Sequence, residues 1–457
     1  MKLKTRRIIL AVCLAVILLV SFKILTIYIG LNAEKASSNN ISCSMFQRPF
    51  YNGNYSKRFI AKNNVELRLW AKNLTGTGVL TITDEKEQVV FTKDFKQIEN
   101  DFSLDLKPNI YNINVAVKNY TGGVYVGLKN TYPIYKLPNA NYEIVNSNIN
   151  KGFNYQYILF TPTKVNHKNI LVMPNNTGLV CENIEIHKNS AISLAIKQAQ
   201  LATKLGVPLL VPIFPRTEVM DTHSLDRITI LVPDNERLDL QLIAMVKDCQ
   251  KRLKDGDINV ANKILMFGFS ASGDFTDRFS FLHPELVKAT VIGGCNNMVP
   301  LKTFKGENLP YPIGVYDYQD ITGKDFNINT FKAINRFIYK GSKDEGGWQV
   351  ITNNGKTNTY TWLEYYNKFI TENTKKLSQS KPTPVYVKGN LSDQDNDVIL
   401  HRVYNKVLLE RFKIIKDLYA NKGLSNSEFR IYENVKHEIT TEIANDIYEF
   451  LKDALNE

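Results

Sequence analysis

The chain has 457 residues, of which 44% are hydrophobic, and its formal net charge is +12. This length is enough to bury a large core and predicts more than one domain. The lysines that carry the charge are dispersed and no recognition motif accompanies them, which argues against a nucleic-acid-binding protein. The five cysteines, at positions 13, 43, 181, 249 and 295, show no paired spacing, which argues against a metal knuckle and a disulfide framework. We expect no disulfide, no metal and no cofactor.

The first 35 residues have the pattern of an export segment. Two arginines precede an uncharged run over residues 8–22, and a second apolar run covers residues 24–31. Together the runs are long enough to span a bilayer at about 1.5 Å per residue. Leu31-Asn32-Ala33 is a poor cleavage site, so we expect an uncleaved single-pass anchor in the cell membrane, with the body of the protein outside. The alternative is a cleaved signal peptide and a secreted protein.

Residues 44–130 contain no helix-like period. Apolar residues alternate with polar neighbours in two stretches, at Val65, Leu67 and Leu69 and again at residues 111–117. Thr121-Gly122-Gly123 is typical of a hairpin turn. We therefore expect a small β-sandwich, which either binds wall or substrate polymer or serves as a spacer that lifts the rest of the chain from the membrane.

Residues 140–457 alternate strand-like and helix-like segments, which predicts an α/β domain with a mainly parallel sheet and helices on both faces. Helices are expected near residues 191–205, 237–254, 404–421 and 440–455. The helix at 237–254 has an apolar face, which we expect to pack on the sheet just before the strand that precedes Ser270.

A polar turn follows the strand expected at residues 169–173. It has the sequence Pro174-Asn175-Asn176-Thr177-Gly178, and such a turn is suited to exposing backbone N–H groups. We assign one donor of an oxyanion hole to the N–H of Asn176, with Asn175 and Thr177 as neighbouring alternatives. Asn175 is also a candidate for binding substrate.

A second polar group follows the strand end at Phe214. Its members would either line the rim of a site, with His223 in contact with substrate, or form a solvated turn held by an Asp–Arg pair. The group consists of Arg216, His223, Asp226 and Arg227.

The sequence KILMFGFSASG around Ser270 is the most informative stretch of the chain. An apolar strand breaks there into Ser270, with the small residues Gly268 and Ser272 two places before and after it. A sharp strand-to-helix turn strains its central residue and tolerates only small neighbours, which is how a nucleophilic serine is presented. The usual pattern has Gly in the place of Ser272, and here Gly273 comes one residue late. The N–H of Ala271 would be the other oxyanion donor.

A nucleophilic serine needs a base, and an acid that orients the base. Asp344 follows the strand-like run FIYKG, and His437 follows a short strand pattern that ends in a loop. The chain order Ser270, Asp344, His437 is that of nucleophile, acid and base in hydrolases with a G-x-S-x-G turn, and it differs from the chymotrypsin and subtilisin orders. The alternative acids, after a second strand-like run, are Asp393, Asp395 and Asp397.

Residues 346–397 form a long insertion after Asp344 and should overhang the site. Trp362 begins a helically spaced aromatic stripe in this insertion. The stripe would either face a substrate cleft as part of a cap, which makes Trp362 a candidate substrate contact, or pack on the domain beneath. Its members are Trp362, Tyr365, Tyr366, Phe369 and Ile370.

Several segments resemble a group of bacterial serine hydrolases of the α/β-hydrolase superfamily, related to extracellular esterases and depolymerases. The segments are MPNNTG, VPLLVPIFPR, DTHSLDR, RLDLQLIAMVKDCQKRL, GFSASGDFTDRFSFLHPELVKA, FIYKGSKDE and NVKHEIT. The resemblance covers most of residues 140–457. It implies the α/β-hydrolase fold, a serine-hydrolase mechanism and the triad roles given above, and it implies no substrate.

The sequence therefore predicts an exported serine hydrolase that cleaves a carboxylic ester, of a small molecule or a polymer, through Ser270, His437 and Asp344. The alternatives are a peptidase or amidase with the same triad, and a non-catalytic cell-surface binding protein on a hydrolase scaffold. The net charge would draw an exported protein toward anionic wall polymer or lipid headgroups, or it reflects a Lys- and Asn-rich composition with no specific partner.

Overall fold

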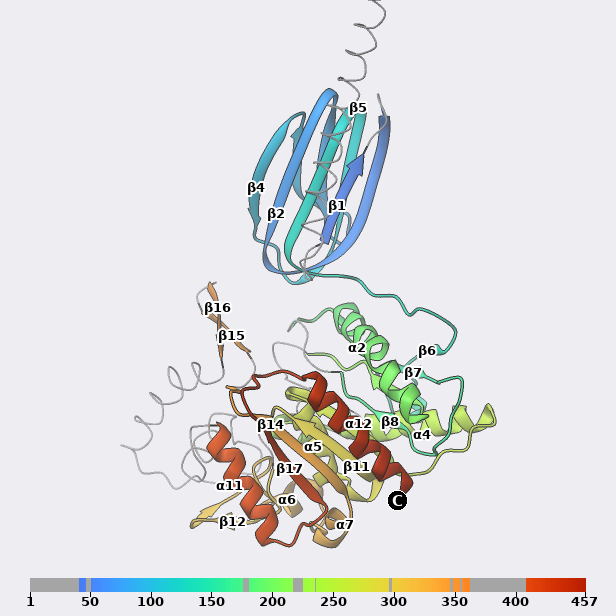
Figure 1. Cartoon of the computed structure of the whole chain (residues 1–457), viewed down its shortest axis with the longest axis vertical. Helices are drawn as coiled ribbons and strands as arrows, with labels where there is room; N and C mark the ends of the chain where they lie inside the picture. Colours follow the sequence, from blue (N-terminus) through green and yellow to red (C-terminus); the bar gives the residue numbers. More distant parts are fainter. Residues whose placement is uncertain are drawn as a thin grey trace, which may run out of the picture. The chain divides into compact units, whose positions relative to one another are not determined.

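The computed structural model describes residues 41–46, 51–175, 181–216, 225–234, 236–295, 298–345, 348–353, 356–361 and 408–457. The expected membrane anchor at residues 1–35 lies outside these ranges. Among the helices of the described ranges, none is long and apolar enough to span a membrane. The chain divides into two compact units, Met1–Tyr135 and Lys136–Glu457, whose elements are labelled in Figure 1.

The first unit is built from antiparallel strands. Its core contains the alternating residues that the sequence indicated, including Val65, Leu67, Leu69, Ile113 and Val115, all of which are buried. The predicted period of two is therefore confirmed in both stretches. The strands are β1 (Ile41–Phe46), β2 (Tyr51–Thr83), β3 (Val89–Phe95), β4 (Ile98–Leu104) and β5 (Asn109–Tyr132).

The expected hairpin at Thr121-Gly122-Gly123 is wrong, because β5 continues through these residues. The register between β2 and β5 shifts there instead: the part of β5 before Tyr120 pairs with both ends of β2, and the part after it pairs with the middle of β2. Gly122 has a φ of 155°, and a Cβ at this position would lie 2.1 Å from the carbonyl oxygen of Lys72. The glycine thus permits a close backbone approach where the strand changes partners.

The second unit contains a mixed sheet of eight strands in the order β17-β14-β11-β10-β8-β9-β7-β6. The strands from β17 to β9 are parallel, as predicted, while β7 is antiparallel to both of its neighbours. The strands are β6 (Tyr142–Val145), β7 (Tyr157–Phe160), β8 (Leu171–Val172), β9 (Leu209–Pro212), β10 (Ile264–Phe269), β11 (Val287–Gly293), β14 (Asn335–Gly341) and β17 (Ser427–Tyr432).

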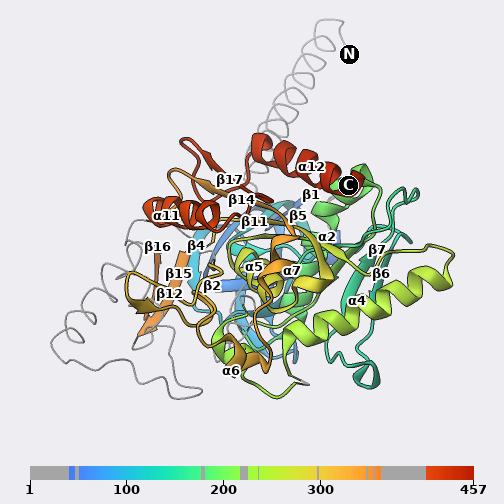
Figure 2. The ribbon, with the colours of Figure 1, turned by 90° about the horizontal axis from the view of Figure 1, so that it is seen from below.

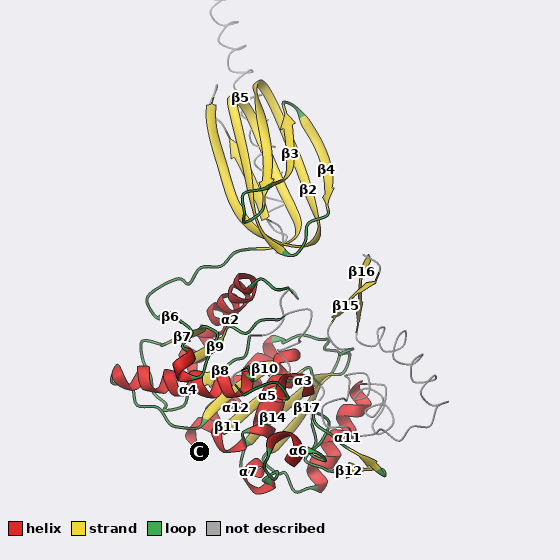
Figure 3. Ribbon diagram, turned by 180° about the vertical axis from the view of Figure 1, so that it is seen from behind, coloured by secondary structure: helices red, strands yellow, loops and turns green. Residues whose placement is uncertain are grey.

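Helices cover both faces of this sheet, as Figures 2 and 3 show. One core cluster joins the sheet to α4 (Leu238–Asp255), α5 (Ala271–Leu282) and α11 (Leu408–Asn421). The other joins it to α2 (Ile184–Leu205) and α12 (Thr441–Asn456). Burial on both faces explains why β10 is a continuous apolar run.

The helix expected at 191–205 begins earlier, at Ile184. The side chain of Asn183 accepts a hydrogen bond from the Glu185 N–H and caps the helix, and Ile186 is buried. The polar residues after Ile186 conceal this first turn in the sequence pattern. The helices expected at 237–254 and 440–455 agree with α4 and α12 to within one residue at each end. For the helix expected at 404–421, the described part is α11.

Short elements complete the second unit. They are η1 (Ile149–Lys151), α3 (Arg227–Ile230), η3 (Pro284–Leu286), β12 (Thr303–Phe304), β13 (Glu307–Asn308), α6 (Tyr318–Thr322), α7 (Ile328–Lys332), β15 (Trp348–Asn353) and β16 (Lys356–Thr361). The antiparallel pair of β15 and β16 lies at the start of the expected insertion.

Candidate active site

Ser270 lies between the end of β10 and the start of α5, with φ 63° and ψ −130°. A positive φ is strained for a residue with a side chain, and the neighbours must be small for the turn to form. A Cβ on Gly268 would lie 1.9 Å from the carbonyl oxygen of Ser272 and 2.6 Å from Thr276 Oγ1. The Ser270 turn is therefore the strained strand-to-helix turn that the sequence predicted.

Ser272, two residues after Ser270, holds this turn together. Its Oγ accepts a hydrogen bond from the Phe269 N–H and donates one to the Phe269 carbonyl, both at 3.0 Å. Gly273, which comes one residue late for the usual pattern, lets α5 approach β11: a Cβ there would lie 2.7 Å from the Gly293 carbonyl oxygen. The departure from the motif thus has a structural explanation, and Ser272 is engaged with the backbone.

Asp344 and His437 lie together at the carboxyl edge of the sheet. Asp344 follows β14, His437 follows β17, and Asp344 Oδ1 lies 2.9 Å from His437 Nδ1. The Asp344 side chain is 1% exposed and that of His437 is 20% exposed. This contact uses Nδ1 of the imidazole, so the tautomer with a proton on Nδ1 leaves Nε2 as an acceptor.

Backbone hydrogen bonds join the two segments that carry this pair. The Ser342 N–H donates to Tyr432 O and the Lys343 N–H donates to Val435 O, each at 2.9 Å. A Cβ on Gly341 would lie 2.3 Å from Val435 O, so only glycine permits the approach. The parallel pairing of β14 and β17 therefore continues into the loops and sets the spacing of Asp344 and His437.

His437 also packs against the residue that precedes Ser270. The ring centroids of Phe269 and His437 are 4.7 Å apart. Gly294 has a φ of +63°, and a Cβ there would lie 2.7 Å from Phe269 Cε2 and 3.0 Å from His437 Cε1. Within the described residues the Ser270 hydroxyl makes no hydrogen bond to His437.

The described part of the expected oxyanion hole is Ala271, the first residue of α5. Asn176 and Thr177 lie outside the described residues. The buried amide of Asn175 accepts from the Phe214 N–H at 3.0 Å and donates to the Phe214 carbonyl at 2.8 Å. Its amide thus joins the ends of β8 and β9, which favours a role in fixing the backbone before Asn176 over a direct contact with substrate.

Two members of the polar group after Phe214, Asp226 and Arg227, form ion pairs with buried partners. Arg227 is buried and forms an ion pair with Asp317, and Asp226 pairs with Arg278 of α5. Arg216 donates its backbone N–H to the buried His187 at 3.3 Å. The expected solvated turn held by an Asp–Arg pair is therefore wrong, because Arg227 is buried and each of the two residues pairs with a partner elsewhere in the chain. His223 and Trp362 lie outside the described residues, as do Asp393, Asp395 and Asp397.

Sequence reasoning missed three residues around the pair. Phe269 packs on His437, Gly294 leaves room for the imidazole by having no Cβ, and Lys340 Nζ lies 3.4 Å from Asp344 Oδ2. A lysine inside the apolar run FIYKG is the one signal in the sequence that pointed to such a contact. The contacts of Phe269 and Gly294 become visible only when the strand order is known.

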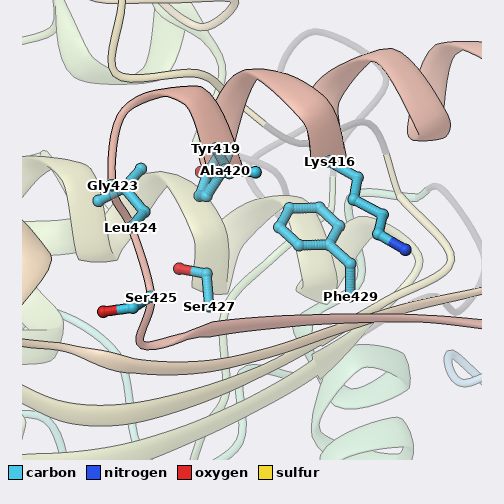
Figure 4. A pocket seen from close by; sticks show the side chains of 8 residues that line it. All are labelled: Lys416, Tyr419, Ala420, Gly423, Leu424, Ser425, Ser427 and Phe429. Carbon is cyan, nitrogen blue, oxygen red and sulfur yellow. The ribbon is translucent and has the colours of Figure 1, made fainter.

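Two hollows lie at the opposite, amino edge of the sheet. One, of about 240 Å³, is shown in Figure 4 and lies between α11 and the start of β17. The other, of about 580 Å³, is lined by residues that include Lys168, Lys263 and Lys288. None of Ser270, Asp344 and His437 lines either hollow, so we assign neither a part in the chemistry.

The features of the second unit together identify its fold. A mainly parallel sheet carries a strained serine turn at its carboxyl edge, and an aspartate and a histidine follow later strands in that chain order. The fold is that of an α/β-hydrolase.

No protein-family model and no curated protein matches the chain. Among solved structures, it resembles an acetyl xylan esterase from Aspergillus awamori, with a TM-score of 0.34 and 12% identity over 68% of this chain and 100% of that one. An S-formylglutathione hydrolase from Agrobacterium tumefaciens gives a TM-score of 0.35 and 8% identity over 71% and 98%. The glycosylation associate protein complex Gap123 from Streptococcus agalactiae gives 0.29 and 10% over 91% and 68%. These likenesses are remote, so the roles proposed below depend on residues of this chain.

Proposed function

We propose that the protein is an exported serine hydrolase that cleaves a carboxylic ester through Ser270, His437 and Asp344. The observation that carries the proposal is the 2.9 Å contact of Asp344 Oδ1 with His437 Nδ1, beside the strained turn of Ser270. A buried carboxylate on Nδ1 holds the imidazole in the tautomer whose Nε2 can take a proton from a serine.

In the proposed reaction, Ser270 Oγ attacks the ester carbonyl carbon while His437 Nε2 takes the hydroxyl proton. The tetrahedral intermediate collapses, His437 returns the proton to the leaving alcohol oxygen, and an acyl group remains on Ser270. Water then attacks this acyl group with His437 again as base, which releases the acid and restores Ser270. Asp344 stays ionised and stabilises the imidazolium.

The proposed oxyanion donors are the N–H groups of Ala271 and Asn176. Ala271 opens α5, and the first N–H groups of a helix lack intrahelical partners and carry partial positive charge. The Asn175 amide would support the second donor by fixing the backbone just before it. Removing one donor of this kind typically lowers kcat by about 10²- to 10³-fold.

The remaining parts of the proposal rest on the sequence. Residues 1–35 would anchor the protein in the cell membrane with the hydrolase outside, or would be cleaved to release it. The first unit would be a β-sandwich. This interpretation is supported by the pairing of β5, whose first half pairs with both ends of β2 and whose second half pairs with the middle of β2. This unit would bind wall polymer or act as a spacer, and residues 346–397 would form a cap.

Labelling of the full chain with a fluorophosphonate probe tests the proposal, because only an activated serine reacts appreciably. We expect labelling and ester turnover in the wild type, and neither in Ser270→Ala, which should remain folded. The matched control is Ser425→Ala, which removes an exposed serine at the amino edge of the sheet, opposite Ser270. This variant should label normally. Absence of labelling in a folded wild type would favour a non-catalytic scaffold, and faster turnover of amides than of esters would favour the peptidase alternative.

A further inference from the structure

Lys340 is a buried cation in the last part of β14. Side chains alternate along this strand, and Phe337 and Tyr339 belong to the core between the sheet and α2 and α12. Lys340 therefore shares the other face with Ile338, whose cluster includes α5 and α11. Its residue exposure is 2%, which is rare for lysine unless the ammonium is paired.

The partner of this ammonium is the carboxylate of the proposed triad. Lys340 Nζ lies 3.4 Å from Asp344 Oδ2, while the other oxygen, Oδ1, lies 2.9 Å from His437 Nδ1. Both members of the Lys340–Asp344 pair are buried, so solvent screens their attraction little. The three groups form a continuous chain from the interior of the sheet to the imidazole.

Stability alone is a weak explanation for this pair. Removing two charges from water is costly, and well-packed apolar residues in their place are often as stable or more so. A charge next to Asp344, however, acts directly on the equilibrium between imidazole and imidazolium. The position of Lys340 therefore has a clearer consequence for the reaction than for the fold.

We propose that Lys340 is a positioning residue for the triad: it holds Asp344 Oδ2 and, by its charge, lowers the basicity of His437. The inference rests on the proposed function. With Lys340 in place, the negative charge that favours the imidazolium is partly compensated. Removing the ammonium should therefore favour the protonated imidazole, which cannot act as base.

Lys340 is the buried cation that the structure places in direct contact with the carboxylate bonded to His437. Burial raises the pKa of the Cys295 thiol well above its ordinary value, although Lys340 lowers it, so this thiol is neutral. Burial likewise raises the pKa of Tyr339, whose ring stacks on the ring of Phe269. Lys436 and Glu438, next to His437 in the chain, are exposed and screened by solvent.

The test is the pH dependence of kcat/KM for the full chain and for Lys340→Met. The acidic limb reports the pKa of the base in the free enzyme. We expect this limb to move upward by about one pH unit in the variant, the size expected for one charge several ångströms away in a partly buried site. Lys343→Met removes an equal but exposed charge from the same turn and should leave the limb in place. Lys340→Gln gives the same prediction if the Met variant does not fold.

A lower melting temperature with an unmoved limb would overturn the inference and leave Lys340 with a structural role. The proposed function fails separately, through a wild type that neither labels nor hydrolyses esters. In that case the titration of His437 itself, followed by NMR of histidine-labelled full chain and assigned with His437→Ala, still decides the inference. If the His437 titration moves to higher pH in Lys340→Met, the inference is supported. If the titration is unchanged, the inference is refuted.

Discussion

The α/β-hydrolase unit contains two aspartate–histidine pairs with nearly the same distance between carboxylate and imidazole, near opposite ends of α5. Asp344 lies 2.9 Å from His437 beside Ser270, which precedes the helix, and Asp239 lies 2.8 Å from His283, which follows it. Each imidazole also packs on a phenylalanine, with ring centroids 4.7 Å apart at His437 and 5.0 Å apart at His283. An Asp–His contact alone therefore does not identify a catalytic pair.

The two pairs differ in which imidazole nitrogen contacts the aspartate and in what lies beside the ring. His283 uses Nε2 on Asp239, and its Nδ1 lies 4.0 Å from Glu285. Asp239 also receives two hydrogen bonds from Arg237. At His437 the aspartate occupies Nδ1, and a strained serine turn lies beside the ring. At His283 the aspartate contacts Nε2, whereas at His437 it contacts Nδ1 and leaves Nε2 as an acceptor near the serine turn.

The largest expected effect separates the two histidines. His437→Ala should lower kcat/KM for an ester by about 10³-fold or more, because the members of a triad act as a unit. His283→Ala should leave kcat/KM within a few-fold of the wild type and lower the melting temperature, because it leaves the buried Asp239 with one partner fewer. Steady-state kinetics and thermal unfolding of both variants provide the measurement. Equal losses of activity would contradict the distinction.

The two aspartates sharpen the same comparison. Asp344→Asn should cut turnover by orders of magnitude, because the amide stabilises the wrong imidazole tautomer. Asn substitutions at Asp393, Asp395 and Asp397 should have mild effects. A large loss in one of these and a mild one in Asp344→Asn would transfer the role of the acid to that residue.

Asp239→Asn should instead change the dependence of stability on pH. Burial raises the pKa of Asp239, but the hydrogen bonds from His283 and Arg237 outweigh it and the pKa is lowered overall. A lowered pKa in the folded state stabilises the protein above the unfolded-state value of about 3.9, and this contribution is lost as the pH falls through the folded-state value. Melting temperatures measured between about pH 2 and 6 should therefore fall less steeply in the variant, and parallel curves would contradict this role of Asp239.

The smallest expected effect concerns the glycine that makes room for His437. Gly294→Ala adds a Cβ about 3.0 Å from His437 Cε1 at a positive φ, so the imidazole must move. We expect a loss in kcat of about 10- to 100-fold, since small displacements at a reacting centre can cost this much. Gly323→Ala is the control: its φ of +70° imposes comparable strain, but nothing lies within 4 Å of the added Cβ. A similar loss of kcat in both variants would point to general destabilisation.

Sequence patterns were sufficient for groups that follow strands. Ser270, Asp344 and His437 each come after a recognisable apolar run, and parallel strands bring such positions to one edge of the sheet. Contacts between distant segments had no comparable signal. Asp239 and His283 are 44 positions apart without a motif, and the partner of Arg227 became evident only through the fold.

Local turn chemistry was informative at one glycine site and misleading at another. Small residues around Ser270 indicated a sharp turn because the strand pattern stopped there. At Gly122 the alternation continues, and the missing Cβ lets the backbone of β5 approach the backbone of β2 closely. A glycine in a strand pattern fits both a turn and a close approach, and only the pairing partners distinguish them.

The backbone hydrogen bonds from Ser342 and Lys343 to the segment after β17 bear on the timing of activity during synthesis. The serine turn requires β10, α5 and β11, which are adjacent in the chain and can pair as soon as they are made. The proposed acid and base meet only after β17 has paired with β14, and β17 begins at Ser427, far later in the chain than the end of β11 at Gly293. A ribosome-bound intermediate that stops short of β17 can therefore contain a formed serine turn while the contact between Asp344 and His437 has not yet formed.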